Sequence, residues 1–368
     1  MKSARVPTEV VPEGESVDDK VRRFARRLGF DAVGVARADE PIELEHARYE
    51  AFIAEGRHGE MHYLATGSEA RKRLDSEFIL SGAKSVVCVA MRYARPDEEA
   101  RGVTPLIARY ARGRDYHGFM KKRLRKLADF VRTLGEGVQA RALCDIEPVM
   151  ERVWAVRAGL GFVGKNGLLI TPGQGSYSLL GEVVTTLPLL PDTAMNERCG
   201  SCTRCLDACP TNAFTAPFVL DPRRCVSYAT IEAKSTPEED VGVHMGEHLF
   251  GCDDCQSVCP FNRTAMASVE CTQPFAPFDV WQTMRLPDAV TMDVGTFERV
   301  SVGSPMRRAG RAGLARNAAL LAAGRLAAGK ETEEDVICLR AALDHDEPAV
   351  RSVAERALGG RDSGRDRL

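Results

Sequence analysis

The sequence has no apolar run long enough to span a membrane, no apolar signal-peptide core within Met1 to Ser16, and almost no net charge. A formal charge of −2 excludes a uniformly basic coat for nucleic acid, although a basic face is compatible with a neutral total. These absences predict a soluble, cytoplasmic protein with no membrane partner. With 368 residues, 44% of them hydrophobic, the chain is long enough for two or three compact units.

The first half of the chain alternates between helical and extended patterns, which predicts an α/β domain over residues 17–190. Apolar extended stretches predict strands at Asp31–Ala36 and Lys84–Met91. Met120, Leu124, Leu127 and Val131 form one apolar stripe, so Phe119–Leu134 is expected to be an amphipathic helix with a basic outer face.

Glycines divide the end of this domain into shorter elements. Pro148–Ala158 is typical of a helix that ends at Gly159. Gly167–Ile170 and Leu179–Thr185 are predicted to form a pair of strands joined by a glycine-rich loop. Residues 1–16, before the first helical pattern, are expected to be disordered.

The second half has a different composition. Residues 191–265 combine cysteine, proline and short turns with too little apolar surface for an independent core, so we expect a ferredoxin-like domain that is stabilised by metal. Residues 266–358 contain Ala- and Leu-rich patterns, including a helix begun by Pro348, and are predicted to be HEAT-like helices. Residues 359–368 are predicted to be a disordered tail. The fold class is therefore mixed α/β and α+β, in several domains.

Cysteine spacing gives the most specific signal. Eight of the twelve cysteines lie between Cys199 and Cys259, and Cys199-x2-Cys202-x2-Cys205-x3-Cys209-Pro is the bacterial ferredoxin run, whose fourth cysteine crosses to a second 4Fe-4S cluster. Cys252-x2-Cys255-x3-Cys259-Pro repeats the last three positions, and Cys225 is the candidate for the missing ligand. Structural zinc is the alternative, but zinc sites rarely use this triple spacing. The predicted ligand sets are Cys199, Cys202, Cys205 and Cys259 for one cluster, and Cys225, Cys252, Cys255 and Cys209 for the other.

Around these cysteines the chain resembles the epoxyqueuosine reductases. The matching strings include Gly59-Glu60-Met61, Gly113-Arg114-Asp115-Tyr116-His117, Gly164-Lys165-Asn166, Cys225-Val226-Ser227-Tyr228-Ala229-Thr230, Gly251-Cys252-Asp253-Asp254-Cys255 and Arg316-Asn317-Ala318. The resemblance covers most of the chain. It implies a base-off cobalamin between the α/β and ferredoxin-like domains, electron relay through both clusters, and reduction of the epoxide of epoxyqueuosine in tRNA to give queuosine.

The family's acid opens a motif that reads Asp145-Ile146-Glu147-Pro148 here, with the Asp and Pro kept and the middle pair changed. The resemblance implies that Asp145 is the catalytic residue. Loss of an epoxide oxygen as water needs two protons, so a carboxylic acid with a pKa raised by burial suits this role. Without the resemblance, an Asp before a helix is more typical of a helix cap.

Further site residues follow from the resemblance. Ser227, Thr230, Lys165, Tyr116 and His117 are expected to bind the cofactor, with ordinary turn, cap or helix-start roles as the alternative. Among the basic residues, Lys234, Arg109 and Arg114 are candidate substrate contacts. Basic groups that could together meet a tRNA backbone include Arg71-Lys72-Arg73, Arg112, Lys121 to Lys126, and Arg307 to Arg316, although singly each is more typical of a solvated face.

Other function classes stay open at this point. A reductive dehalogenase also joins cobalamin to two clusters, but such enzymes normally carry an export signal. A plain ferredoxin-like electron carrier would need no active-site acid. A nucleotide-binding reductase is suggested by Gly159-x-Gly161-x-x-Gly164, but that string follows a helix where the dinucleotide motif follows a strand. The expected partners are tRNA and an electron donor such as a flavodoxin or ferredoxin, and the chain is expected to be a monomer.

Overall fold

The structure is a computed structural model, and it describes residues 14–93, 100–266 and 275–365. The predicted disorder of residues 1–13 and 366–368 lies outside these ranges. In chain order the elements are α1 (Val17–Arg27), β1 (Ala32–Arg37), α2 (Glu43–Ala54), η1 (His62–Ala65), α3 (Ser68–Lys72), β2 (Ser85–Arg92), η2 (Thr104–Leu106), η3 (Arg109–Ala111), α4 (Tyr116–Arg132), β3 (Ala140–Leu143), α5 (Glu151–Arg157), β4 (Phe162–Val163), β5 (Leu169–Ile170), β6 (Ser178–Thr185), α6 (Arg204–Asp207), β7 (Phe214–Ala216), β8 (Val219–Leu220), η4 (Pro222–Arg224), α7 (Val226–Ile231), α8 (Glu239–Val243), α9 (Asp254–Ser257), α10 (Pro260–Met266), α11 (Asp279–Thr283), α12 (Leu286–Thr291), α13 (Val294–Val300), η6 (Pro305–Arg308), α14 (Gly310–Ala327), α15 (Glu333–Leu343) and α16 (Pro348–Arg365).

A four-stranded sheet forms the centre of the first unit, in the order β1-β2-β6-β3. Every neighbouring pair is antiparallel. The first seven residues of β2 are all buried, because this inner strand has helices over both faces. The predicted strands at 31–36 and 84–91 are confirmed, and the unit is a mixture of helices and strands as expected.

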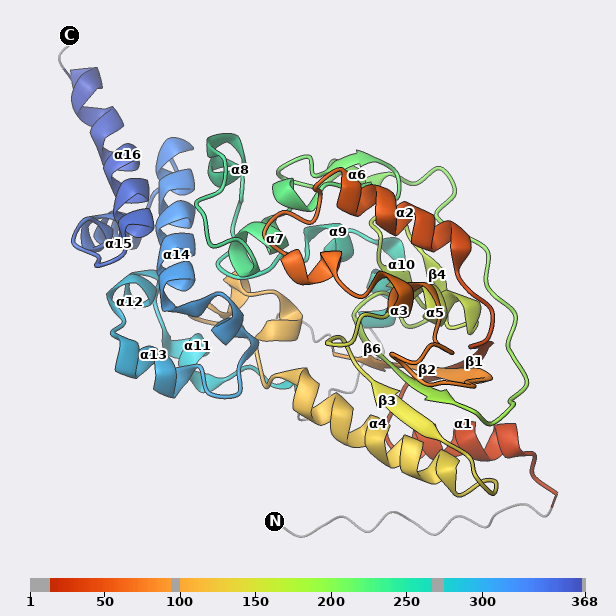
Figure 1. Ribbon diagram of the computed structural model, residues 1–368. Coiled ribbons are helices and arrows are strands. Elements are labelled where there is room, and N and C mark those ends of the chain that lie inside the picture. Colours follow the sequence, from red (N-terminus) through yellow and green to blue (C-terminus); the bar gives the residue numbers. More distant parts are fainter. Residues whose placement is uncertain (1–13, 94–99, 267–274, 366–368) are drawn as a thin grey trace.

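Helices cover both faces of the sheet (Figure 1). On one face, α1 and α4 pack against it, and the predicted stripe of α4 is confirmed, since Met120, Leu124, Leu127 and Val131 are fully buried. Close packing of α4 depends on Gly181 of β6, where a Cβ atom would lie 2.6 Å from a methyl of Leu124. On the other face α5 packs against the sheet through Trp154 and Ala155.

The predicted pairing of Gly167–Ile170 with Leu179–Thr185 is wrong. β5 pairs with β4, whereas β6 enters the central sheet between β2 and β3. The glycine-rich loop turns back on itself through Thr171 and Gly175, so it ends one small hairpin and starts a separate strand.

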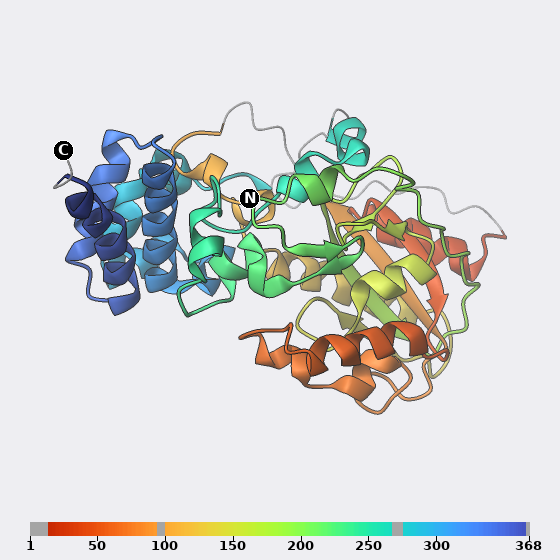
Figure 2. The ribbon, with the colours of Figure 1, turned by 90° about the horizontal axis from the view of Figure 1, so that it is seen from above.

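The cysteine-rich segment contains only short helices, turns and the small β7–β8 hairpin. One apolar cluster joins Cys259 of this segment to Phe162 and Ile170 of the β4–β5 hairpin, with partly buried Met195, Cys199 and Phe261 beside it. Other buried apolar residues of the segment, such as Val226, Leu249 and Phe250, pack into the core of the C-terminal helices, and stabilisation of the segment by metal stays a prediction. Figure 2 shows this segment between the sheet unit and the C-terminal helices.

The C-terminal unit is helical, as predicted, and its core also includes residues from η2, η3 and α7. The HEAT-like character of its helices stays a prediction. Helix α16 continues to Arg365, so residues 359–365 are helical where a disordered tail was predicted. None of the described helices is long and apolar enough to cross a membrane.

Candidate active site

Four side chains meet where α4 starts and just after β3 ends. Asp115 is the N-cap of α4, accepting from the His117 backbone N–H at 2.9 Å, and its Oδ1 lies 2.7 Å from His117 Nδ1. The cap therefore fixes the imidazole with Nε2 directed at Asp145, whose Oδ2 is 2.8 Å away. Tyr116 donates its hydroxyl hydrogen to the same Oδ2 at 2.7 Å.

Asp145 is held by its backbone as well as by its side chain. Its φ of 61° is left-handed, a conformation that Asp tolerates better than most residues and that costs conformational energy. Its backbone N–H donates to Glu151 Oε1 at 2.8 Å. The helix-cap alternative is wrong, because α5 begins at Glu151 and its N-cap position is Met150.

The expected electrostatic state of Asp145 is wrong. The carboxyl is about half exposed, and the hydrogen bond from His117 lowers its pKa despite partial burial, with Tyr116 acting in the same direction. Conversely, Asp115 and Asp145 raise the pKa of His117 to about 9. At neutral pH the proton of this pair therefore resides on His117, and the acid of the site is an imidazolium held by two carboxylates.

The wall of the site, which is formed by Tyr63, Ile146 and Arg308, lies near the Asp145 carboxyl. Tyr63 is 49% exposed and Ile146 is 66% exposed, and Arg308 lies over the Tyr63 ring at 5.3 Å. Arg308 is in turn paired with Glu232 at 2.8 Å. Exposed aromatic and aliphatic surface next to a proton donor suits a flat, partly apolar ligand.

Glu60 docks the loop that carries Tyr63 onto the segment after α7. Its carboxylate accepts from the Lys234 backbone N–H at 2.8 Å and from Ser235, and its own backbone N–H donates to the Tyr228 hydroxyl at 2.8 Å. A Cβ atom at Gly59 would lie 2.3 Å from that hydroxyl, so glycine is needed for this contact. The Gly59-Glu60 string thus joins the sheet unit to the wall of the site.

The predicted cofactor residues after Cys225 differ in their accessibility. Thr230 is fully buried, donates to the Val226 carbonyl at 2.7 Å and accepts from the Gly251 N–H at 2.9 Å. The Thr230 hydroxyl is thus used inside the protein, and its predicted contact with the cofactor stays a prediction. Ser227 is only partly buried. Burial raises the pKa of the Cys225 thiol, and a hydrogen bond from Ser227 partly offsets this increase.

Two predicted lysines are engaged with backbone carbonyls. Lys165 Nζ donates to the carbonyls of Gly200 at 2.6 Å and Cys202 at 3.0 Å, so it holds the first loop of cysteine ligands. Lys234 Nζ donates to the Arg308 carbonyl at 2.8 Å, on the wall of the site. Arg114 is exposed beside Asp115, where it remains a candidate substrate contact.

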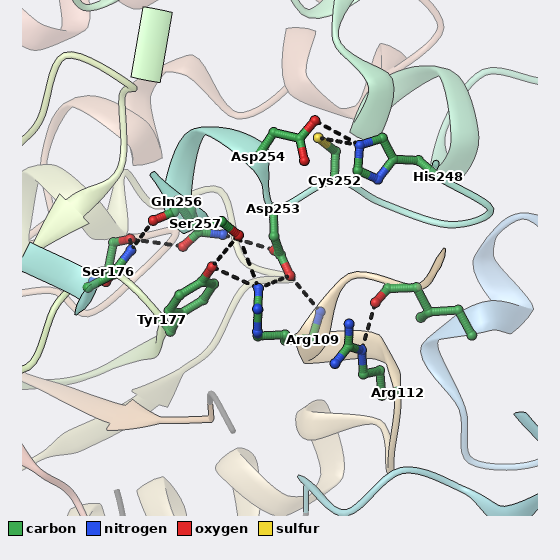
Figure 3. Close-up of polar contacts among 12 residues, drawn as sticks. Arg109, Arg112, Ser176, Tyr177, His248, Cys252, Asp253, Asp254, Gln256 and Ser257 are labelled. Atoms are coloured by element: carbon green, nitrogen blue, oxygen red, sulfur yellow. Dashed lines mark hydrogen bonds and ion pairs between the residues drawn. The ribbon is translucent and has the colours of Figure 1, made fainter. Parts of the chain in front are cut away.

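Arg109 is a structural anchor (Figure 3). Its Nη1 donates to the hydroxyls of Tyr177 at 2.9 Å and Ser257 at 3.2 Å and lies 3.4 Å from the Asp253 carboxylate. The Arg109 backbone N–H also donates to that carboxylate at 2.8 Å. These contacts connect η3 and the residue before β6 to α9, so Arg109 joins the two units, and its predicted contact with substrate stays a prediction.

Several other basic residues predicted to meet RNA are also internal. Arg316 is 2% exposed and donates to the carbonyls of Ala229, Ala233 and Ser235. Arg71 and Arg112 are likewise buried on backbone carbonyls. The prediction that these three face tRNA is wrong, whereas Lys122, Arg125, Lys126, Arg307 and Arg308 are exposed.

The grouping of the eight cysteines into two ligand sets stays a prediction. Burial raises the pKa of Cys205, and the nearby Cys259 and Cys202 add to this, which agrees with a Cys259 that lies close to the first run. Burial likewise raises the pKa of Cys225, with Cys209 contributing. Among the described residues all of these thiols are free of disulfides, and Cys88 and Cys338 are buried apolar residues as expected. Cys271 lies outside the described residues.

His248 was not identified from the sequence. Its Nε2 lies 2.9 Å from Asp254 and 3.5 Å from the Cys252 thiol (Figure 3). A lone histidine in a turn gives no signal of this contact. Its position beside a predicted iron ligand suits a hydrogen bond that tunes a cluster.

Comparisons with known proteins agree with this arrangement. Residues 198–262 match a family model described as a 4Fe-4S double cluster binding domain, and residues 73–146 match one described as epoxyqueuosine reductase QueG, DUF1730. The chain is similar to epoxyqueuosine reductases from Gloeobacter violaceus (41% identity, 81% of this chain and 93% of the relative) and from Xanthomonas campestris (37% identity, 92% and 94%).

A solved epoxyqueuosine reductase that holds an epoxyqueuosine-modified tRNA-Tyr stem loop has a TM-score of 0.81 and 28% identity, over 93% of this chain and 89% of that one. An epoxyqueuosine reductase from Streptococcus thermophilus shares the fold, with a TM-score of 0.76 over 94% of this chain and 99% of that one. With its paired cysteine runs and a matching overall fold, the chain belongs to the epoxyqueuosine reductase family.

Proposed function

We propose that this chain reduces the epoxide of epoxyqueuosine in tRNA to give queuosine, using base-off cobalamin and electrons relayed by two 4Fe-4S clusters. The observation that carries the proposal is the Tyr116–His117–Asp145 cluster, an exposed acid beside the apolar wall of Tyr63 and Ile146. A plain electron carrier would have no use for such an acid. Family membership supports the same activity.

The residues present fit both cofactors. Eight thiols in two crossed sets are the ligands that two cubane clusters need. The exposed Tyr63 and Ile146 would offer apolar contact to the cofactor near Asp145, and the partly buried Ser227, which follows Cys225, would contact it from the cysteine-rich segment. When bound there, cobalamin supplies electrons to the substrate carbon framework. No Asp-x-His-x-x-Gly string supplies a histidine ligand, consistent with the base-off form.

The chain's own residues would handle the protons. His117, charged at neutral pH, gives its proton to the leaving oxygen through Asp145, whose Oδ2 it faces at 2.8 Å. Tyr116 keeps the carboxylate oriented, and burial together with the Asp145 charge raises the Tyr116 pKa so that its own hydrogen stays in place. Asp115 holds the imidazole in the orientation that this transfer needs.

The test is anaerobic turnover of tRNA carrying epoxyqueuosine, with added cobalamin and a strong reductant, followed by mass spectrometry of the digested nucleosides. Loss of the mass of one oxygen atom, dependent on cobalamin, is the expected result. An unchanged nucleoside in a preparation with intact clusters and bound cobalamin would refute the proposal.

We further propose that the electron donor, a flavodoxin or ferredoxin, docks at a cavity of about 750 Å³ beside Cys259. Arg204 and Arg263 line it, with Asp207 the acidic exception, so an acidic partner fits by charge. The double charge reversal Arg204→Glu with Arg263→Glu should slow cluster reduction by such a donor and leave reduction by dithionite unchanged. Equal slowing with both reductants would contradict this docking site.

The tRNA would be held by phosphate contacts from exposed basic side chains, Arg114, Arg307 and Arg308 near the acid, and Lys122, Arg125 and Lys126 on α4. Lys234 supports Arg308 through its backbone carbonyl. We also propose that the chain acts as a cytoplasmic monomer.

A further inference from the structure

His248 lies just before a stretch of backbone that is fixed on both sides. The next residue, Leu249, is fully buried, its N–H donates to the Leu106 carbonyl at 2.8 Å, and its carbonyl accepts from the Asn317 amide at 3.0 Å. The His248 side chain is itself only 13% exposed. An imidazole that is packed on a fixed backbone holds its contacts in one geometry.

One nitrogen of this imidazole meets two partners from the second cysteine run (Figure 3). Nε2 lies 2.9 Å from Asp254 Oδ2 and 3.5 Å from Cys252 Sγ, and the three atoms lie within 4.8 Å of one another. A thiolate that ligates iron has no hydrogen, so with iron bound both partners can only accept. The hydrogen is then on Nε2, where the carboxylate and the sulfur share it.

Other thiols of the same predicted ligand set also receive hydrogen bonds. Cys209 Sγ accepts from the Ala213 N–H at 3.2 Å. The Ser227 hydroxyl bonds the Cys225 thiol. The imidazole differs from these donors because a carboxylate shares its hydrogen, so its bond to sulfur depends on the balance between two neighbouring side chains.

Burial and charge oppose reduction of a cluster at this place. Burial raises the pKa of the Cys252 and Cys255 thiols, and the Asp254 carboxylate adds to the rise at Cys252. The same two effects disfavour the extra negative charge that a cluster gains when it is reduced. Hydrogen bonds to the sulfurs act the other way and raise the reduction potential. His248 therefore offsets both effects, because it donates to one sulfur and hydrogen-bonds the nearby carboxylate.

We propose that His248 is a positioning residue for electron transfer, which acts through Cys252 to raise the reduction potential of the cluster nearer the cobalamin. The proposal rests on the proposed function, in which that cluster is held by the set that includes Cys225 and Cys252, next to Ser227. Each transfer moves one electron and no proton, from a flavodoxin or ferredoxin to the cluster of Cys259 and then to the cluster of Cys252. A raised potential at the second cluster makes the transfer between the clusters more favourable.

A redox titration monitored by electron paramagnetic resonance tests this on the full chain with both clusters loaded, without tRNA or turnover. His248→Phe keeps a ring but no donor, so one of the two midpoint potentials should fall by the equivalent of about a tenfold change in the ratio of oxidised to reduced cluster, or about 59 mV for one electron. His248→Gln keeps an N–H donor and should restore most of this loss. His244→Phe, at an exposed position beside α8, is the matched control and should leave both midpoints unchanged.

Two further variants separate tuning from structural damage. Asp254→Asn removes the competing carboxylate and should raise the midpoint that His248→Phe lowers, an opposite shift that loss of structure does not produce. Cys225→Ala, which lacks a predicted ligand of that cluster, should lose the same midpoint. Unchanged midpoints in His248→Phe, or an equal shift of both, would overturn the proposal.

Wild-type protein provides the test if His248→Phe does not load iron. With its histidines labelled with nitrogen-15, pulsed paramagnetic resonance of the reduced clusters should detect a weakly coupled imidazole nitrogen, and the absence of this coupling would overturn the proposal. None of these measurements uses tRNA. An unchanged nucleoside in turnover assays would therefore refute the proposed function, whereas the midpoint potentials still decide the role of His248.

Discussion

At the residue scale, the acid of the site depends on a pair. The sequence identified Asp145, Tyr116 and His117 separately, but it could not show that His117 and Asp145 share one proton. That depends on the side-chain direction set by the Asp115 cap and on the left-handed backbone at Asp145. For the same reason, sequence reasoning predicted a raised pKa for the Asp145 carboxyl, whereas the hydrogen bond from His117 lowers that pKa.

Asp145→Asn should retain iron and cobalamin and lose turnover by roughly two to four orders of magnitude, the usual contribution of a positioned proton donor. An amide keeps the shape but can neither stabilise the imidazolium nor accept its proton. Single-turnover assays with nucleoside mass spectrometry provide the measurement. Asp129→Asn, a change at an exposed position on α4, is the control, and full activity of Asp145→Asn would remove it from the mechanism.

The pH dependence of stability follows from two raised pKa values. Glu151 titrates at about 7 in the folded protein and near 4.5 when unfolded, so the folded state holds the extra proton between these values and stability falls as pH rises. His117 has the same sign between 6.5 and about 9, because its charged form is stabilised by folding and is lost above that range. The melting temperature should therefore decrease from pH 5 to 9. Glu151→Gln should flatten the lower part of this decrease and His117→Gln the upper part; unchanged slopes in both variants would contradict these assignments.

At the element scale, strands and helices with a clear apolar period were predictable, and their pairing was less so. β2 was found because it is a continuous apolar run, and α4 because its buried residues recur at helical spacing. β5 and β6 are both apolar segments, and nothing local distinguishes a small hairpin from a strand in the central sheet. Likewise, the basic residues around Arg316 are typical of a surface helix, although Arg316 itself is held inside the protein by three backbone carbonyls.

Arg316→Ala should therefore destabilise the protein, by about 3 kcal/mol, because it leaves buried carbonyls without donors between α7 and α14. Denaturant unfolding monitored by circular dichroism measures the loss. Arg340→Ala, at an exposed position on α15, should change stability by less than about 0.5 kcal/mol. Equal stability of the two variants would mean that Arg316 does not hold these helices together.

At the scale of the whole molecule, the predicted domain boundaries follow changes in composition along the sequence. The hydrophobic cores, in contrast, combine residues from segments that are far apart in the sequence. One core combines Val103, Ile107 and Ala111 with Val226 of the cysteine-rich segment and with the C-terminal helices. Arg109 and Glu60 add polar connections between the same units. Composition reports which segments need metal, but it contains no information on which distant segments share a core.

Loss of one cluster should therefore affect more than electron transfer. Cys225→Ala removes one predicted ligand of the second cluster, so iron content should fall by about half and the melting temperature should decrease, because metal stabilises a segment with little apolar core. Iron analysis and thermal unfolding under anaerobic conditions measure both effects.

Cys338→Ala removes a buried thiol from α15 and should keep all iron while costing some stability through packing alone. If Cys225→Ala kept the full iron content, the fourth ligand of the second cluster would have to come from elsewhere in the chain. If the variant lost iron with no change in melting temperature, protein contacts such as Arg109–Asp253 would be enough to hold the segment between the sheet and the C-terminal helices.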